Sequence, residues 1–540
     1  MKAYHGSVLT VDAEDSVASW LVEQGGRIAF VGDVLPERFS GAEVIELDGR
    51  CLVPSFADTH EHFASFALFN AGLNVMDAKS NGEIASLVEA FAKRSKAKTV
   101  IAFGASPFSV SDGRLITREE LDTACPDKPV CLVKYDGHAC VVNSVLLRKL
   151  ESKLSGMRGF HPHSGEMNQE AFFAVSDYMT NSVPIPELIS DMQRAMDYLA
   201  ARGIGMVHIV SGVGFAHDLD ISLERWVGRG AQHGFQVRVF PQSMDIDVAL
   251  KRKLPRIGGC FACALDGCFG SADAALNEPY EPGAAAAAGY ADAEGAGFDG
   301  GQASGNGVLY YTDEQVVDFC KQANRAGLQI EMHAIGDAAF DQATRALKAA
   351  LDDCPRENHR HGIIHACLPT DEGIAICAEY GIHLPVQTSF IDWPQEPDSY
   401  LERILGDRAA ALNPLRRFAD AGIVMSAGSD APCTDPDPIL WMHRACNHSN
   451  ASESITVQEA LRMCTYNGYW TTFDEDDRGS LEEGKVADMA VLSANPYETP
   501  VEDLRSIRVE QLILGGEPYS PQTRNAAAAL AAGMVSRAKI

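Results

Sequence analysis

The stretch PSFADTHEH, residues 54–62, ends a run of apolar residues with two histidines that are separated by a single residue. In an extended strand, residues i and i+2 point to the same side, so His60 and His62 can bind one ion together. The carboxyl end of a strand is also where barrel enzymes hold their catalytic groups. An HxH pair alone is weak evidence for a metal site, and the rest of the chain has to support it.

Eight short apolar runs in the chain are each followed by helical periodicity. Parallel strands that are buried on both faces are continuous apolar runs of this kind. Eight strand and helix repeats predict an α/β fold with a closed (β/α)8 barrel of the TIM type, with an open doubly wound sheet as the alternative. The eight runs are CLVPSFAD (51–58), IGMVHIV (204–210), FQVRVF (235–240), CFACALDG (260–267), LQIEMH (328–333), GIIHAC (362–367), IHLPVQT (382–388) and IVMSAGSD (423–430).

The two ends of the chain share a different pattern, in which apolar and polar residues alternate. Neither end has enough strands to bury a face alone, so residues 1–50 plus 478–520 are predicted to build one composite β-sandwich. The barrel is then assigned to residues 51–77 plus 190–477. The runs TVIAFGA and PVCLVKYDGHA would make ten barrel strands, and they are placed instead in an inserted α/β subdomain, residues 78–189.

Two segments are rich in small residues. Residues 282–307 contain mostly Ala and Gly, which predicts a flexible loop that acts either as a lid over the catalytic face or as a surface insertion without a role. The Ala-rich tail at residues 525–538 is interpreted as an exposed helix that could dock on a second copy of the chain. A homo-oligomer is therefore one of the expectations, and the sequence does not decide it.

The charge of the chain restricts the class of its partners. It has 45 basic and 74 acidic residues, a formal net charge of −29, which repels nucleic acids and anionic membranes. We expect neither as a partner, and a small-molecule substrate instead. No long apolar segment or signal-peptide pattern is present, so a cytoplasmic location is expected. The 14 cysteines lack zinc-ribbon spacing, and most are expected to be buried apolar side chains.

Three further metal-binding side chains stand at the ends of predicted barrel strands: His333, His365 and Asp430. A buried imidazole or carboxylate at a strand end needs a partner. Four imidazoles and one carboxylate that converge at one mouth of a barrel suit a divalent ion such as zinc. Each residue alone could equally be a hydrogen-bonded core group, but the five together predict a metal site.

Six segments of the chain resemble those of the amidohydrolase superfamily, and within it amidohydrolase family 3, the N-substituted formamide deformylase-like metal-dependent hydrolases. They are VPSFADTHEHF, DGHACVVNS, LDGCFGSADAAL, MHAIGDAAFDQA, SAGSDAP and GSLEEGKVADMAVL, and they extend over nearly the whole chain. The resemblance implies the barrel, the composite β-sandwich and a zinc-like divalent ion. It also selects the same five ligand positions.

The chain departs from that family at one position. Members usually carry a lysine four residues before the aspartate of the Asp-Gly motif, and its carbamate bridges two metal ions. Counted back from Asp266, this position is Ala262, which favours one ion over two. Cys260 could supply a thiolate instead, because D-aminoacylases of the same superfamily use a cysteine in the bridging role; core packing is the alternative reading of Cys260.

These observations predict a hydrolase that cleaves a non-peptide C–N bond, in an amide, formamide or cyclic amide, with metal-activated water. Asp430 is the candidate base, and His365 could polarise the carbonyl if it does not bind the ion. His138, in a DGH motif, and His208, near a strand end, are candidates for contact with the substrate. The alternatives are a deaminase or other metal-dependent reaction on the same barrel, and a non-catalytic amidohydrolase-like binding protein.

Overall fold

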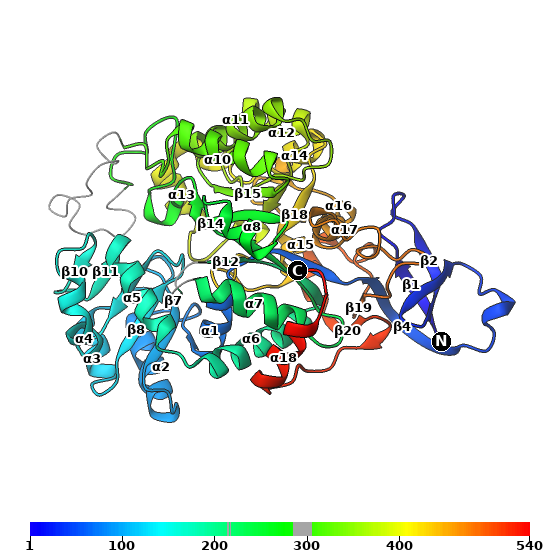
Figure 1. Cartoon of the computed structure of the whole chain (residues 1–540), viewed down its shortest axis with the longest axis horizontal. Helices are drawn as coiled ribbons and strands as arrows, with labels where there is room; N and C mark the ends of the chain where they lie inside the picture. Colours follow the sequence, from blue (N-terminus) through cyan, green and yellow to red (C-terminus); the bar gives the residue numbers. More distant parts are fainter. Residues whose placement is uncertain (213–214, 216–217, 285–304) are drawn as a thin grey trace.

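The computed structural model describes residues 1–212, 215, 218–284 and 305–540, and its central element is a parallel β-barrel that is surrounded by helices (Figure 1). In the described residues, eight strands build the barrel, one from each predicted apolar run. The (β/α)8 fold expected from the sequence is therefore confirmed. The strands are β5 (Phe56–Glu61), β12 (Ile204–Ser211), β13 (Gln236–Pro241), β14 (Arg256–Ala264), β15 (Gln329–Ala334), β16 (Gly362–His365), β17 (Leu384–Val386) and β18 (Met425–Ala427).

Parallel pairing connects these strands in sequence order. Ladders join β5 to β12 and β12 to β13, β14 to β15 and β15 to β16, and β17 to β18. β13 packs beside β14, and a bridge between Gly362 and His383 links β16 to the start of β17. A bridge between Glu61 and Ala431 joins the first strand to the last and closes the barrel. All carboxyl ends therefore meet at one mouth.

Amphipathic helices cover the outside of the barrel. In α10 (Asp313–Arg325), for example, Val316, Phe319, Cys320 and Ala323 are buried at the spacing of one helical face, and Thr312 forms a capping box with Gln315. Further helices in the barrel part of the described chain are α1 (Phe63–Ala71), α6 (Ile185–Ala200), α7 (Leu219–Arg229), α8 (Asp247–Arg252), α11 (Asp337–Asp353), α12 (Asp371–Tyr380), α13 (Asp398–Leu405), α14 (Leu415–Asp420), α15 (Pro438–Cys446), α16 (Val457–Cys464) and α17 (Tyr466–Thr471).

Both ends of the chain contribute to one seven-stranded sheet at the far side of the molecule from the insertion (Figure 1). Its order is β21-β20-β19-β4-β1-β2-β3, and the long strand β4 leads directly into the barrel. A bridge between Arg27 and Val486 ties the β3 edge back to the segment before β19, so the sheet curls around a buried apolar cluster. The strands are β1 (Lys2–Leu9), β2 (Val17–Gln24), β3 (Arg27–Gly32), β4 (Glu43–Pro54), β19 (Met489–Leu492), β20 (Val509–Leu514) and β21 (Glu517–Pro518).

A six-stranded sheet with its own helices is inserted after α1, with the order β10-β11-β9-β8-β7-β6. TVIAFGA and PVCLVKYDGHA form β7 and β8 of this sheet, outside the barrel. The insertion begins at Leu73, before the expected boundary at 78, and α6 already packs on α1 in the barrel core. Its elements are β6 (Leu73–Asn74), α2 (Asn81–Arg94), β7 (Val100–Ala105), α3 (Arg118–Ala124), β8 (Val130–Lys134), β9 (Ala139–Val142), α4 (Ser144–Leu154), β10 (Phe160–His161), β11 (Glu166–Asn168) and α5 (Gln169–Asn181).

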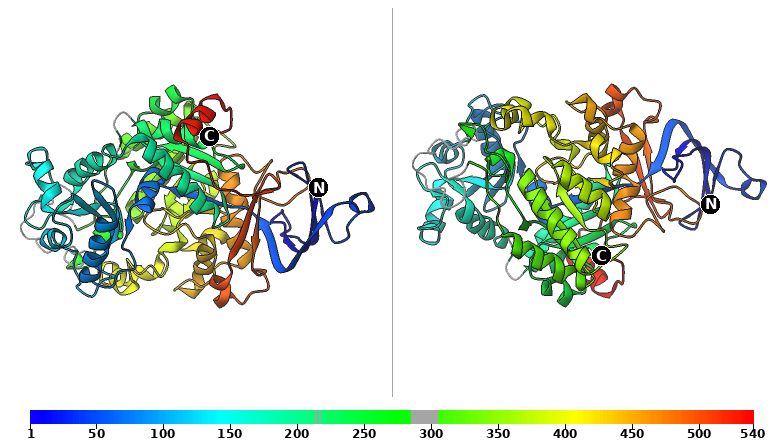
Figure 2. Two further views of the ribbon diagram at one scale, coloured as in Figure 1. Left: turned by 90° about the horizontal axis from the view of Figure 1, so that it is seen from below. Right: turned by 90° about the horizontal axis from the view of Figure 1, so that it is seen from above.

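The two Ala-rich segments have different outcomes. Most of the predicted loop at 282–307 lies outside the described residues. The tail forms α18 (Ala526–Val535), which packs on α6 and α7 of the same chain (Figure 2). Its small residues allow this close approach, since a Cβ at Gly533 would lie 1.8 Å from the carbonyl oxygen of Trp226. In the described residues, no helix is long and apolar enough to cross a membrane.

Candidate metal centre

The barrel mouth brings together all five side chains that the sequence predicted as ligands, and it adds Cys260. β5 supplies His60, with His62 just after it, β14 supplies Cys260, β15 His333, and β16 His365. Asp430 follows β18 and is hydrogen-bonded through its backbone N–H to the carbonyl of His60. All six side chains are buried. The convergence follows from parallel strands whose carboxyl ends share one rim.

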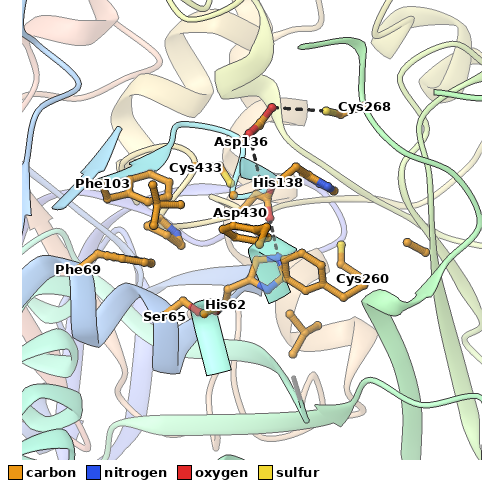
Figure 3. Close-up of a pocket in the computed structure, with 18 of the residues that line it drawn as sticks. His62, Ser65, Phe69, Phe103, Asp136, His138, Cys260, Cys268, Asp430 and Cys433 are labelled. Atoms are coloured by element: carbon orange, nitrogen blue, oxygen red, sulfur yellow. Dashed lines mark hydrogen bonds and ion pairs between the residues drawn. The ribbon is translucent and has the colours of Figure 1, made fainter. Parts of the chain in front are cut away.

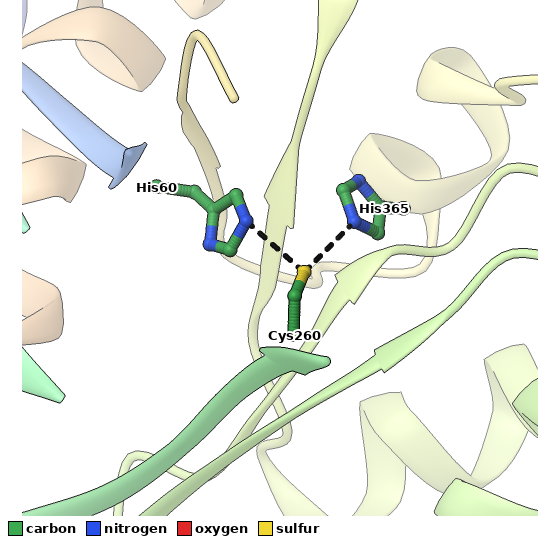
Figure 4. A group of neighbouring side chains, drawn as sticks. All are labelled: His60, Cys260 and His365. Carbon is green, nitrogen blue, oxygen red and sulfur yellow. Dashed lines mark hydrogen bonds between the residues drawn. The ribbon is translucent and has the colours of Figure 1, made fainter. Parts of the chain in front are cut away.

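Two groups of potential metal ligands share His60. In the first, His60 Nε2 and His62 Nε2 lie 3.3 and 3.2 Å from Asp430 Oδ1. In the second, Cys260 Sγ lies 3.2 Å from His60 Nε2 and 3.5 Å from His365 Nε2 (Figure 4). His333 Nδ1 is 3.4 Å from the same sulfur. Three imidazoles therefore surround one thiol.

Hydrogen bonds behind the cluster orient two of these imidazoles. His365 Nδ1 is 2.6 Å from Gln387 Oε1, and because the amide oxygen can only accept, Nδ1–H donates and Nε2 faces the thiol. His333 Nε2–H donates to the carbonyl of Gly267 at 3.1 Å, which leaves Nδ1 facing Cys260. Outer partners of this kind fix the ligand tautomer in metal sites. No local sequence pattern indicates this role of Gln387.

A bulge in β14 directs Cys260 into the cluster. Its pairing with β15 breaks between Gly259 and Ala264, so the residues between them leave the regular ladder. Gly258 and Gly259 permit the bulge: both have positive φ, and a Cβ at Gly258 would lie 1.8 Å from the carbonyl oxygen of Glu331. Counting back from Asp266 to Ala262 assumed a regular strand. The side chain that lies among the imidazoles is that of Cys260.

Two of the candidate ligands have unusual backbone conformations. His365 has φ of +73° and Asp430 has φ of +55°, both in the left-handed region that costs a non-glycine residue free energy. Each stands where a barrel strand turns into its loop. Such strain gathers at functional sites, because the surrounding structure holds the side chain in a required direction.

The charge states at this mouth suit a cation. Burial and the neighbouring histidines lower the pKa of His60 and His365, so both imidazoles are neutral at pH 7 and can ligate a metal. Burial alone would raise the pKa of Asp430, but His60 and His62 hold it well below its ordinary value, so its carboxylate is ionised. Burial and Asp266 act in opposite directions on His333, and the result is a raised pKa.

The donor set itself tests whether a metal fits. In the described residues, Asp430 Oδ1 has no well-oriented hydrogen-bond donor, although it is buried between two imidazoles. A buried carboxylate oxygen without a donor is costly unless a cation compensates it. Imidazole nitrogen, thiolate sulfur and carboxylate oxygen are together the ligands of zinc. The side chains present therefore fit a divalent ion.

A pocket opens above this cluster and extends to the insertion (Figure 3). His138 lines it, and so do several aromatic side chains from the barrel and from the insertion. His138 was a candidate for substrate contact, and its position permits that role. The other candidate, His208, lies deeper in the barrel, beside Thr472 Oγ1 at 3.3 Å, and does not line the pocket. Alternate residues of β12 face the barrel interior, so His208 and Val210 both point inward. Val210 is closer to the carboxyl end of the strand and lines the pocket, whereas His208 lies one layer deeper.

Hydrogen bonds hold the insertion over the mouth. Lys134 Nζ lies 2.8 Å from Asp136 Oδ2 and donates to the carbonyl of Gly270, in the loop after β14. Asp136 Oδ2 also accepts from Ser271 Oγ at 3.2 Å. Tyr135 OH donates to Glu396 Oε1 in the loop after β17. The DGH segment thereby fastens the insertion to two barrel loops.

Comparison with known proteins agrees with this geometry. The profile of a family described as the amidohydrolase family matches residues 43–519. The putative amidohydrolase YtcJ of Bacillus subtilis is 24% identical to the chain, over 96% of this chain and 99% of that protein. The N-substituted formamide deformylase of Arthrobacter pascens is also 24% identical, over 95% and 96%.

Solved structures share the fold. An uncharacterized metal-dependent hydrolase from Pyrococcus furiosus has a TM-score of 0.71 at 23% sequence identity, and the match covers 92% of this chain and 100% of that one. A second such hydrolase, from Pyrococcus horikoshii, has the same TM-score at 21% identity, covering 93% and 99%. The zinc complex of atrazine chlorohydrolase from Arthrobacter aurescens gives 0.52 at 14% identity, covering 99% of each chain.

Proposed function

The chain belongs to the amidohydrolase family and is a metal-dependent hydrolase of carbon–nitrogen bonds. We propose that it cleaves an amide or formamide with metal-activated water. The reaction would take place at the cluster formed by His60, His62, Cys260, His333, His365 and Asp430. The observation that carries the proposal is the convergence of these six buried side chains at the mouth of the barrel, below a pocket that can hold a small molecule. The name of the Arthrobacter pascens relative, an N-substituted formamide deformylase, supports this choice of bond.

We propose zinc as the ion, because imidazole, thiolate and carboxylate suit it better than they suit magnesium or calcium. When it is bound, such an ion polarises a carbonyl group and lowers the pKa of water from about 16 to about 7. His60, His62 and Asp430 would hold it, with the thiolate of Cys260 beside them. The buried thiol has a pKa well above its ordinary value, and a cation next to it favours loss of that proton.

The charge of the cluster favours one ion over two. The Asp430 carboxylate and the Cys260 thiolate together carry about two negative charges, which one divalent ion neutralises. A second divalent ion would leave an excess positive charge in a buried site, and burial of uncompensated charge is costly. His365 and His333 would then orient the Cys260 thiolate and the substrate.

The protein's own groups provide the proton transfers. The ionised Asp430 carboxylate can accept a proton from the attacking water and return it to the leaving nitrogen. His365, which is held by Gln387 and stacked against the ring of Phe390 at 5.9 Å, faces the same space with its unprotonated Nε2, which can accept a hydrogen bond from the substrate. The aromatic lining of the pocket would exclude bulk water from the reacting atoms.

The first test is the metal content per chain, by elemental analysis of protein that is purified without added metal. We expect about one zinc-like ion per wild-type chain and its loss in the His60→Ala, His62→Ala double variant. Hydrolysis of amide and formamide test compounds should stop after chelation and return when zinc is added. A chain that contains no metal, and gains none on reconstitution, would contradict the proposal and favour a binding protein.

The same assays separate hydrolysis of an amide from deamination. Release of ammonia from an aminated heterocycle, with no cleavage of amides, would favour a deaminase on this barrel. No glutamate stands next to His333 or His365 in the sequence to act as the helper acid of such a reaction, and Glu331, two residues before His333, faces His383 at 3.5 Å instead. We therefore expect the carboxylic acid and the amine as products.

A further inference from the structure

We propose that the substrate is an uncharged amide that carries one aryl group and has no carboxylate, an inference that rests on the proposed function. The aromatic side chains and the size of the cavity favour an aryl group, and the charged side chains of its lining disfavour a carboxylate.

Aromatic side chains from four elements surround the space beside the candidate metal ligands (Figure 3). The Phe261 ring lies 4.9 Å from the ring of His62 and 6.2 Å, edge to face, from that of Phe173 in α5. Phe69 of α1 and Phe103 of β7 form another pair at 4.9 Å. An aryl group among such rings gains edge-to-face and stacking contacts in addition to the burial of apolar surface.

Phe261 connects the metal cluster to this aromatic lining, because it follows Cys260 in the bulge of β14. Its φ is +42°, which is unusual for a bulky aromatic residue, and the bulge thus directs the thiol to the imidazoles and the ring to the pocket. A ligand that stacks on Phe261 has its reactive group next to His62.

The space is large enough for one ring. The cavity volume is about 140 Å³. An apolar cavity of about 150 Å³ in another protein binds benzene. A single aryl group fits this volume.

The charged side chains of the lining disfavour a carboxylate. In the described part of the chain, the pocket is lined by no Lys or Arg, while Asp136, Asp220, Glu396 and Asp430 all line it. Lys134, the nearby cation, is bound to Asp136 and to the carbonyl of Gly270. Residues 213–217 and 285–304 contain no Lys or Arg in their sequence. An anionic substrate would meet these carboxylates with no lysine or arginine to pair with, and its desolvation in a buried site is unfavourable.

Matched compounds test both parts. N-Acetylbenzylamine and N-acetylphenylglycine differ by a carboxylate, and N-acetylethylamine lacks the aryl group; the three N-formyl analogues form a second set. We expect kcat/KM for the neutral aryl compound to exceed that of each of the other two by about tenfold or more in at least one set. Equal or faster hydrolysis of the carboxylate compound, or of the ethyl compound, would overturn the proposal.

Variants connect the selectivity to the aromatic lining. Phe261→Ala should lower kcat/KM for the aryl compound by about tenfold and change that of the ethyl compound less than threefold. Phe173, which is 42% exposed and can be replaced with little effect on folding, provides a second variant, Phe173→Ala, with the same pattern. Phe30→Ala, in the terminal sheet and outside the pocket, is the control and should change neither value.

Binding measurements separate a failure of this inference from a failure of the proposed function. If no amide is hydrolysed, the proposed function fails, but calorimetric titration of the wild-type protein with the same three acetyl compounds still tests the pocket. Preferential binding of N-acetylbenzylamine, weakened by Phe261→Ala, would support the neutral aryl preference. No preference among the three would overturn it, whatever the catalytic result.

Discussion

The sulfur of Cys260 lies 3.2 Å from Nε2 of His60, although the two residues come from different strands and stand 200 positions apart. This contact joins the two groups of potential ligands into one cluster, because His60 belongs to both. It also places Cys260 in the ligand cluster, which the sequence around this residue does not require.

Replacement of Cys260 by Ala should weaken metal binding. Loss of an outer partner of a metal ligand typically costs about 10- to 100-fold in affinity, and we expect the loss of a thiolate beside the ion to cost at least as much. Competition with a chelator of known affinity measures the effect. Cys263→Ala is the matched control on the same strand, because Cys263 is equally buried and belongs to neither ligand group. Equal affinities in both variants would show that Cys260 is a packing residue.

Asp430→Asn should lower kcat by about 10²- to 10⁴-fold, the range that a positioned general base contributes. The amide has the same shape as the carboxylate but cannot accept the proton, and steady-state kinetics with saturating zinc isolates this effect from weaker metal binding. Asp435→Asn in the same loop is the control, since that side chain is half exposed and pairs with Arg202. A variant of Asp430 with more than a tenth of the wild-type kcat would rule out its role as the base.

Gln387 is expected to act by positioning His365. Gln387→Leu removes the acceptor 2.6 Å from Nδ1, so the imidazole can rotate or change its tautomer, and zinc affinity or kcat should fall about 10- to 100-fold. Gln387→Glu retains an acceptor at the same place and should recover most of the loss. Equal defects in the two variants would indicate a packing role instead.

A buried ion pair at the other end of the barrel should control acid stability. Arg238 of β13 donates to both oxygens of Asp474, at 2.9 and 2.8 Å, and both side chains are buried. Burial acts to raise the pKa of Asp474, but the bond to Arg238 outweighs it, and the pKa is lower than the ordinary value. The contribution to stability is therefore complete above about pH 4 and is lost as the pH falls toward the folded-state value.

Asp474→Asn leaves the buried Arg238 without its counter-ion, and we expect a loss of about 3 to 5 kcal/mol in the free energy of unfolding at pH 7. Urea denaturation at pH 7 and near pH 3.5 measures both effects, and the difference between wild type and variant should shrink at the lower pH. Asp477→Asn serves as the control, because that half-exposed carboxylate should contribute about 1 kcal/mol or less. A constant difference across this pH range would disprove the assignment.

The inserted sheet shows where sequence patterns lose precision. Its two strongest apolar runs were separated correctly from the barrel, because a closed barrel has no place for ten strands. The boundary at residue 78 was less accurate: β6 consists only of Leu73 and Asn74, and a strand this short has no periodicity to recognise. His208 was misplaced for a related reason. The depth of His208 in the barrel depends on how many residues separate it from the carboxyl end of β12, and the sequence does not define where that strand ends.

The sequence by itself determined the eight barrel strands, the composite use of both chain ends and the convergence of His60, His62, His333, His365 and Asp430. These features follow from local sequence patterns. Burial on both faces requires continuous apolar strands, and parallel strands place their carboxyl ends together. Only the tertiary structure decided the contacts of Cys260 and Phe261. Their directions depend on the bulge that forms where β14 meets β15, and a shift in the pairing of two strands leaves no periodic mark on either one.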